Sequence, residues 1–217
     1  MPAPVIRIDS EQERETALER AGEVILSGGV VAVPTESFYG LAVNALDETA
    51  IHRLFRVKGR REDHPVLILI PSEDVLERYV SDIPDTARRL MRAFWPGGLT
   101  MLFGAGPRIP APLTAGTGKI GVRLSSHPVA AGLARAVGLP VTGTSANLTG
   151  RPPCVRAGEV LQALGEAVDL ILDAGETPGG RGSTVLDVTL DPPVVLREGM
   201  VGREALEGVI PRGRTGS

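Results

Sequence analysis

Residues 28–60 read GGVVAVPTESFYGLAVNALDETAIHRLFRVKGR, and they set the pattern for the whole chain. Four apolar residues at 30–33 predict a buried strand, which Pro34 ends. Asp47 can cap a following helix, whose apolar residues recur at helical spacing. Hydroxyl groups therefore follow the strand, and two cations, Lys58 and Arg60, follow the helix. A small anionic ligand requires both kinds of group, so we expect the functional site in this segment.

The same alternation of strands and helices continues along the chain. Ser10 and Glu13 have the spacing of a capping box and predict a first helix that ends near Gly28. Further helices are expected at 84–94, 128–137, 157–164 and 202–209, and strands at 66–70, 99–103, 120–124, 141–144, 170–172, 184–188 and 194–197. This order favours an α/β sandwich. Links such as 187–194 are too short for a helical crossover, so we expect a mixed sheet with parallel and antiparallel strands.

Length and composition bound the class of protein. The chain has 217 residues, of which 42% are hydrophobic, and this is enough for one domain with a sizeable core. We expect a single domain over residues 1–210 and a flexible C-terminal tail over 211–217. The net charge of -3 excludes a uniformly basic coat for nucleic acid but allows a local basic cleft.

Cysteine usage and hydropathy indicate a cytoplasmic protein. Cys154 is the single cysteine, which excludes an intramolecular disulfide and is typical of a reducing compartment. No apolar run approaches the ~20 residues that span a bilayer. The N-terminus lacks the basic start and apolar core of a signal peptide. We therefore expect a cytoplasmic location and no membrane partner.

Several familiar motifs are absent or accidental. GTGKIG at 116–121 matches a dinucleotide fingerprint by letter, but it leads into a predicted strand instead of opening a helix. As a P-loop it has Leu113 in place of the first glycine and Ile120 in place of the final hydroxyl residue. The three histidines are dispersed and predict no metal site, Cys154 lacks an activating setting, and no Gly-x-Ser-x-Gly elbow occurs.

A dispersed set of cations, hydroxyls and one amide remains. Each member alone is more typical of a surface ion pair or a turn than of a site. Their positions at the ends of predicted strands and helices are those at which ligands collect in α/β sheets. The set comprises Lys58, Arg60, Arg123, Ser145, Asn147, Ser183, Thr184 and Arg197.

In their order along the chain, these residues and their neighbours closely resemble the YrdC/Sua5 family. The motifs are PTESFYGL at 34–41, KGR at 58–60, HP at 64–65, FWPGGLT at 94–100, VR at 122–123, TSAN at 144–147, STV at 183–185 and LREG at 196–199. No single motif is specific, but the ordered set covers about residues 28–199. The resemblance implies a twisted mixed sheet flanked by helices, with a central ligand-binding cleft.

The resemblance also implies an activity. Members of this family make threonylcarbamoyl-adenylate from L-threonine, bicarbonate and ATP, releasing pyrophosphate. The product supplies the threonylcarbamoyl group placed on adenosine 37 of tRNA. The implied enzyme is a nucleotidyltransferase that uses ATP as substrate and Mg²⁺ as a cofactor. Implied partners are the downstream threonylcarbamoyl transferase and tRNA or double-stranded RNA.

Roles for individual residues follow from the same resemblance. The catalytic pair is Lys58 and Arg60, which would neutralise the triphosphate of ATP. The expected ATP-binding residues are Lys58, Arg60, Ser145, Asn147 and Arg197. The expected threonine-binding residues are Thr35, His64, Arg123 and Ser183, with Arg123 suited to the carboxylate through a bidentate fork.

Two departures and three alternatives accompany this interpretation. Arg61 stands where the family commonly has proline, and the chain lacks the second domain of longer members, so it resembles the short, single-domain form. A carbamoyl-adenylate enzyme of hydrogenase maturation is one alternative, although such proteins add cysteine-rich modules. A noncatalytic RNA-binding module using Arg56, Lys58, Arg60 and Arg61 is another. The third is a paralogue with a changed substrate.

Overall fold

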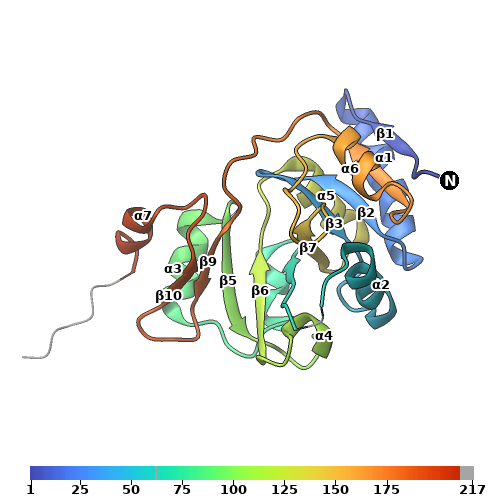
Figure 1. Ribbon diagram of the computed structural model, residues 1–217. Coiled ribbons are helices and arrows are strands. Elements are labelled where there is room, and N and C mark those ends of the chain that lie inside the picture. The colour runs from blue at the N-terminus through green and yellow to red at the C-terminus, as the bar shows by residue number, and fades with distance from the viewer. Residues whose placement is uncertain (62, 211–217) are drawn as a thin grey trace, which may run out of the picture.

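The computed structural model describes residues 1–61 and 63–210, and the tail expected at 211–217 lies outside them. In the described chain, one ten-stranded sheet has the order β1-β8-β2-β3-β7-β4-β6-β5-β9-β10 (Figure 1). Its strands are β1 (Val5–Arg7), β2 (Val31–Pro34), β3 (Tyr39–Ala42), β4 (Leu67–Leu69), β5 (Leu99–Gly104), β6 (Lys119–Arg123), β7 (Val141–Ser145), β8 (Leu170–Asp173), β9 (Thr184–Asp187) and β10 (Val194–Arg197). The helices are α1 (Glu11–Leu26), α2 (Glu48–Lys58), η1 (Glu73–Arg78), α3 (Asp85–Phe94), α4 (Ala111–Thr114), α5 (Pro128–Val137), α6 (Ala157–Leu164) and α7 (Arg203–Glu207).

The strand pairing confirms a mixed α/β sheet. β4 and β6 are parallel, whereas β5 and β6 are antiparallel. The short link after β9 leads into an antiparallel neighbour, β10, as its length requires. No helix in the described part of the chain is long and apolar enough to cross a membrane.

Side-chain caps fix the starts of the first two long helices. Ser10 Oγ accepts a hydrogen bond from Glu13 N at 3.2 Å, which begins α1. Asp47 Oδ1 accepts from Thr49 N at 2.9 Å, which begins α2. Gly59 ends α2 with a left-handed φ of 55°, so the chain turns away before Arg60. The predicted capping roles of Ser10 and Asp47 are therefore confirmed.

Two strands and two short helices escaped sequence prediction. β3, where the sequence pattern predicts no strand, pairs antiparallel with β2 across the tight turn 35–38. Its small residues Gly40 and Ala42 give no apolar alternation. β1 has only three residues and joins the sheet edge through the distant β8. The short helices η1 and α4 likewise offer too few residues for a periodic pattern.

The sheet separates two hydrophobic cores. Along residues 30–33, Val31 and Val33 belong to the core under α1 and α5, whereas Val30 and Ala32 belong to the other core. The larger core continues beneath α2, α3 and α6. Helices α1 and α5 approach closely because Gly132 lacks a side chain, since a Cβ there would lie 2.5 Å from Leu18 Cδ1.

Helices α1 and α5 cover only part of their face of the sheet. Their core draws on β2, β3 and β8, with contributions from β4 and β7. On β5, β6 and β9, the apolar residues Met101, Val122 and Leu186 point into the opposite core. The other face of these three strands is thus left for a ligand. In Figure 1 this part of the sheet stands at the left, with α3 behind it.

Candidate functional site

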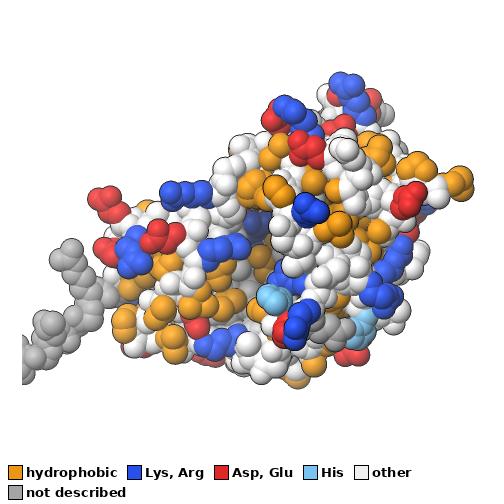
Figure 2. Space-filling view, viewed as in Figure 1, with side chains coloured by type: hydrophobic (Ala, Val, Ile, Leu, Met, Phe, Trp, Pro, Cys, Tyr) orange, Lys and Arg blue, Asp and Glu red, His pale blue; other side chains and the backbone are white. Residues whose placement is uncertain are grey.

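A cavity of about 750 Å³ lies on the part of the sheet face that α1 and α5 leave uncovered. Its walls come from the β2–β3 turn at 35–38, the segment after α2, and residues 181–183 of the connection between β8 and β9. Figure 2 shows the molecule hollowed at its middle, with Lys or Arg atoms in the depth of the hollow. This volume is ordinary for a small-molecule site.

Strand register builds the polar part of the cavity floor. Leu69 on β4 pairs with Arg123 on β6, and Thr100 on β5 pairs with Val185 on β9. The β5–β6 and β9–β10 registers complete one row across five strands. Residues level with each other in a sheet point to the same face. The row is Leu69, Arg123, Thr100, Val185 and Arg197, and every member lines the cavity.

The neighbouring row of the floor is apolar, and it alternates between glycine and leucine. It consists of Gly143, Leu67, Gly121 and Leu102, all of which line the cavity. A Cβ at Gly143 would lie 2.6 Å from Leu67 Cδ1, and one at Gly121 would lie 3.1 Å from Leu67 Cβ, so a side chain at either position would crowd its neighbours. The two rows together place charged and hydroxyl groups beside a flat apolar surface.

Arg123 is a buried cation with capacity to bind a further group. The residue is 5% exposed, and its Nη1 lies 3.5 Å from Glu36 Oε1. Ser125 Oγ donates to Glu36 Oε2 at 2.6 Å, which fixes the carboxylate. Within the described chain, Arg123 Nε and Glu36 Oε1 are buried without hydrogen-bond partners. Burial lowers the pKa of Arg123, and the nearby Glu36 opposes that shift.

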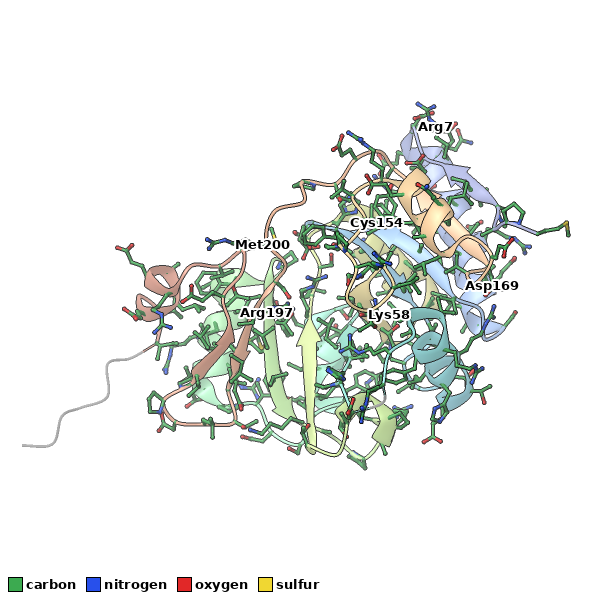
Figure 3. The ribbon with its side chains drawn as sticks, viewed as in Figure 1. Arg7, Lys58, Cys154, Asp169, Arg197 and Met200 are labelled. Atoms are coloured by element: carbon green, nitrogen blue, oxygen red, sulfur yellow. The ribbon has the colours of Figure 1, made fainter. Side chains whose placement is uncertain are left out.

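Arg197 and Ser183 meet at the β9–β10 end of the floor. Arg197 Nη2 donates to the carbonyl of Ser183 at 2.8 Å and to Ser183 Oγ at 3.1 Å. Ser183 Oγ also lies 2.8 Å from Thr100 Oγ1. Burial lowers the pKa of Arg197. Figure 3 shows Arg197 at the end of β10, away from Lys58 at the end of α2.

A second cationic position lies at the opposite end of the floor. Because β7 runs antiparallel to β4 whereas β6 runs parallel to it, Ser145 and Arg123 end their strands at opposite edges. Arg60 also lines the cavity and donates from Nη2 to Pro65 O at 2.8 Å. Its Nε is buried without a partner among the described residues, and burial lowers its pKa. The cavity thus offers guanidinium groups at both ends.

Lys58 does not line the cavity. It is 2% exposed, and its Nζ donates to Ser145 O, to Asn147 O at 2.9 Å and to Asn147 Oδ1 at 3.4 Å. Burial, and after it the charge of Arg60, lowers the pKa of Lys58 to about 8. In this arrangement the Lys58 ammonium holds the segment that presents Ser145. Its expected contact with phosphate stays a prediction.

Asn147 and His64 also lie outside the cavity lining. Asn147 Nδ2 donates to Leu148 O at 3.0 Å and to Arg151 O at 2.5 Å, so its amide stabilises the turn after β7. His64 is exposed, and its Nδ1 lies 2.7 Å from Asp63 Oδ1. The expected ligand contacts of both residues stay predictions. The polar atoms of Asn147 are used by the chain itself, and those of His64 face the outside.

Thr35 does line the cavity, with a hydroxyl committed to the β2–β3 turn. Its Oγ1 donates to Phe38 O at 2.7 Å and accepts from Ser37 N at 3.2 Å. Of the nine residues proposed from the sequence, those that line the cavity are Thr35, Arg60, Arg123, Ser145, Ser183 and Arg197.

Sequence reasoning missed three residues that the structure brings to the site. Glu36 was quoted within a motif, but nothing in the sequence paired it with Arg123. Thr100 follows a proline- and glycine-rich turn, where its hydroxyl carries no distinctive signal. Arg181 lines the cavity from the glycine-rich connection between β8 and β9.

The described residues hold no group of three or more His, Cys, Asp or Glu side chains that could bind a metal. The Mg²⁺ expected from the resemblance stays a prediction. Cys154 is buried, and burial raises the pKa of its thiol, which is the setting of an inert cysteine.

Sequence comparison connects this geometry to known proteins. The profile of the Sua5/YciO/YrdC family, described as "Telomere recombination", matches residues 23–199. The threonylcarbamoyl-AMP synthase of Pyrococcus abyssi is 39% identical over 92% of this chain and 59% of its own length. That of Bacillus subtilis is 36% identical over 93% of this chain and 59% of its own. The chain thus spans about three fifths of both relatives.

Structural comparison gives the same result. A crystal structure of P. abyssi Sua5 complexed with L-threonine superposes with a TM-score of 0.91 and 38% identity. The superposition covers 97% of this chain and 61% of that protein. The twisted mixed sheet with a central cleft is therefore the fold that this group of proteins shares.

Proposed function

The chain belongs to the Sua5/YciO/YrdC family, and on that premise we propose that it makes threonylcarbamoyl-adenylate from L-threonine, bicarbonate and ATP. The observation that carries the proposal is the cavity with guanidinium groups at both ends, at Arg60 and at the pair Arg123 and Arg197. Two anionic substrates that must react with each other need cations on either side of the reacting atoms.

The threonine part of the cavity is assigned to the row that contains Arg123. Its buried guanidinium has an unpaired Nε–H and lines the cavity, as recognition of a carboxylate requires. Ser183 lies on the same part of the floor, and Thr35 forms part of the wall. A relative of known structure was crystallised with L-threonine, which supports this class of ligand.

The nucleotide is assigned to the end of the cavity formed by Arg60 and Ser145. From there it would extend toward Arg197 at the opposite end. Arg60 keeps an unpaired N–H, and Ser145 is held by Lys58 through its carbonyl. Lys58 and Asn147 act in this proposal as positioning residues. The flat row of Gly121 and Gly143 leaves room for atoms that lie against the sheet.

The reaction has two steps. The neutral amine of threonine attacks bicarbonate carbon, and loss of water leaves a carbamate. A carbamate oxygen then attacks the α-phosphorus of ATP, an O–P bond forms, and pyrophosphate leaves with the electron pair of the broken bond. Nucleophile, phosphate and leaving group are all anionic, so positioning and cationic stabilisation dominate over acid–base chemistry.

The product would carry its activated threonylcarbamoyl group to a transferase acting on adenosine 37 of tRNA. The alternative of a noncatalytic RNA-binding module gains little support from the cations at 56–61. Lys58 is buried, Arg60 lines the cavity, and Arg61 pairs with Asp63 at 3.0 Å.

One assay tests the proposal. Purified protein is incubated with ATP, bicarbonate and single amino acids, and pyrophosphate is measured. We expect release that requires both threonine and bicarbonate, together with a threonylcarbamoyl-adenylate product identified by mass spectrometry. Release that is independent of either substrate, or none in folded protein, would contradict the proposed activity.

A further inference from the structure

Thr100 has no role in the reaction above, although its hydroxyl lies in the floor of the cavity. The residue is 1% exposed and lines the cavity from β5. Its Oγ1 lies 2.8 Å from the Oγ of Ser183, a buried residue directly before β9. The cavity lining therefore contains two buried hydroxyl groups in contact with each other, between apolar neighbours.

The hydroxyl pair of Thr100 and Ser183 retains hydrogen-bonding capacity. Ser183 Oγ accepts from Arg197 Nη2 at 3.1 Å, and one hydrogen bond joins the two hydroxyls. Two O–H groups are present, and the bond between them uses one hydrogen. No other hydrogen bond to Thr100 Oγ1 is formed by residues in the described chain. The pair therefore has one O–H left to donate and at least one lone pair left to accept.

The position of the pair relative to Arg123 suits an amino-acid side chain. Thr100 is the cross-strand neighbour of Arg123 on β6 and of Val185 on β9. Adjacent strands lie ~5 Å apart. An amino acid whose carboxylate binds Arg123 thus places its β-carbon near the next strand, where Thr100 and Ser183 present hydroxyls. Val185 and Leu102 supply apolar surface on the same face of the floor.

We propose that Thr100, together with Ser183, recognises the β-hydroxyl group of the substrate amino acid and makes the site selective for threonine. The substrate hydroxyl accepts the spare hydrogen of the pair and donates to its spare lone pair. The methyl group contacts Val185 and Leu102. An analogue without the hydroxyl leaves both buried groups unpaired, and such sites reject analogues by large factors. This inference rests on the proposed function.

The test compares L-threonine with L-2-aminobutyrate, which differs only in lacking the hydroxyl. In the wild-type protein we expect kcat/KM for threonine to exceed that for 2-aminobutyrate by at least ~1000-fold. The isosteric variant Thr100→Val should lose ~10–100-fold with threonine and less than about threefold with 2-aminobutyrate. Selectivity therefore falls while the basic reaction persists.

Thr114→Val is the matched control, because it removes a buried hydroxyl that donates to Ala111 O at 2.9 Å outside the cavity. Its selectivity should equal that of the wild type. Calorimetric binding of both amino acids to the wild-type protein needs no variant and must give the same preference. Equal affinities, or equal loss of both substrates in Thr100→Val, would overturn the role of Thr100. If the wild-type protein releases pyrophosphate with neither amino acid, that result would instead contradict the proposed function, and this inference with it.

Discussion

Arg123, which lines the cavity, forms an ion pair with Glu36, with Nη1 and Oε1 3.5 Å apart. Their side chains are 7% and 9% exposed. Each keeps a buried polar atom without a hydrogen-bond partner in the described chain. An ion pair removed from water is costly unless its remaining groups are satisfied. The unpaired N–H of Arg123 is thus an incomplete interaction that a bound carboxylate would complete.

The first prediction concerns this carboxylate site. Arg123→Lys should raise the KM for threonine roughly 10–100-fold, because an ammonium group cannot reproduce a charged bidentate contact. The KM for ATP should change less than about threefold, since the proposed nucleotide site at Arg60 and Ser145 lies at the other end of the cavity. Arg135→Lys, on α5 outside the cavity lining, is the control. Equal increases in both KM values would contradict the division of the cavity.

The second prediction concerns stability. Glu36→Gln leaves Arg123 as an uncompensated buried charge, and breaking a buried pair typically costs ~3–5 kcal/mol. We expect denaturant unfolding to show a decrease of that order. The double variant Glu36→Gln/Arg123→Met should recover much of the free energy of unfolding, because no lone charge then remains buried, while threonine binding stays lost. A double variant less stable than both single variants would be inconsistent with an ion pair of this kind.

The pattern of apolar residues predicted most of the strands, because short apolar runs such as 99–103 and 120–124 are typical of buried strands. The site was harder to predict, because its geometry comes from register between distant strands. Arg123, Thr100 and Arg197 form one row only after β6, β5, β9 and β10 are paired. Nothing local in FWPGGLT or STV reveals that Thr100 and Ser183 share a hydrogen bond.

Lys58 illustrates the limit of assigning roles by motif. Its position beyond α2's apolar stripe and next to Arg60 indicates a cation for phosphate. Residue type cannot tell whether the ammonium faces a ligand or the carbonyl groups of its own chain. Its Nζ donates to Ser145 and Asn147, which are 87 and 89 residues away in sequence, so no local pattern could reveal these contacts.

The third prediction uses the pKa of Lys58. Burial lowers this pKa to about 8 from an ordinary value of 10.5, so between these pH values the unfolded chain binds more protons than the folded one. Stability contributed by this group therefore increases with pH across that window, by up to about 3 kcal/mol. The free energy of unfolding of the wild type, minus that of Lys58→Met, should rise from pH 8 to pH 10.5. A flat difference would mean that the Lys58 ammonium is not destabilised by burial.

The last prediction separates two neighbouring arginines. Arg60 lines the cavity with a buried, unpaired Nε–H, whereas Arg61 is exposed and forms an ion pair with Asp63 at 3.0 Å. Loss of one preorganised charge contact to a reacting phosphate costs ~100–1000-fold in rate. We expect Arg60→Ala to reduce pyrophosphate release by that factor, and Arg61→Ala to change it less than about twofold because exposed pairs contribute little. Thermal unfolding checks that both variants remain folded. Because the two residues differ in orientation but not in charge, equal effects would show that overall positive charge, and not the geometry of the cavity, governs the reaction.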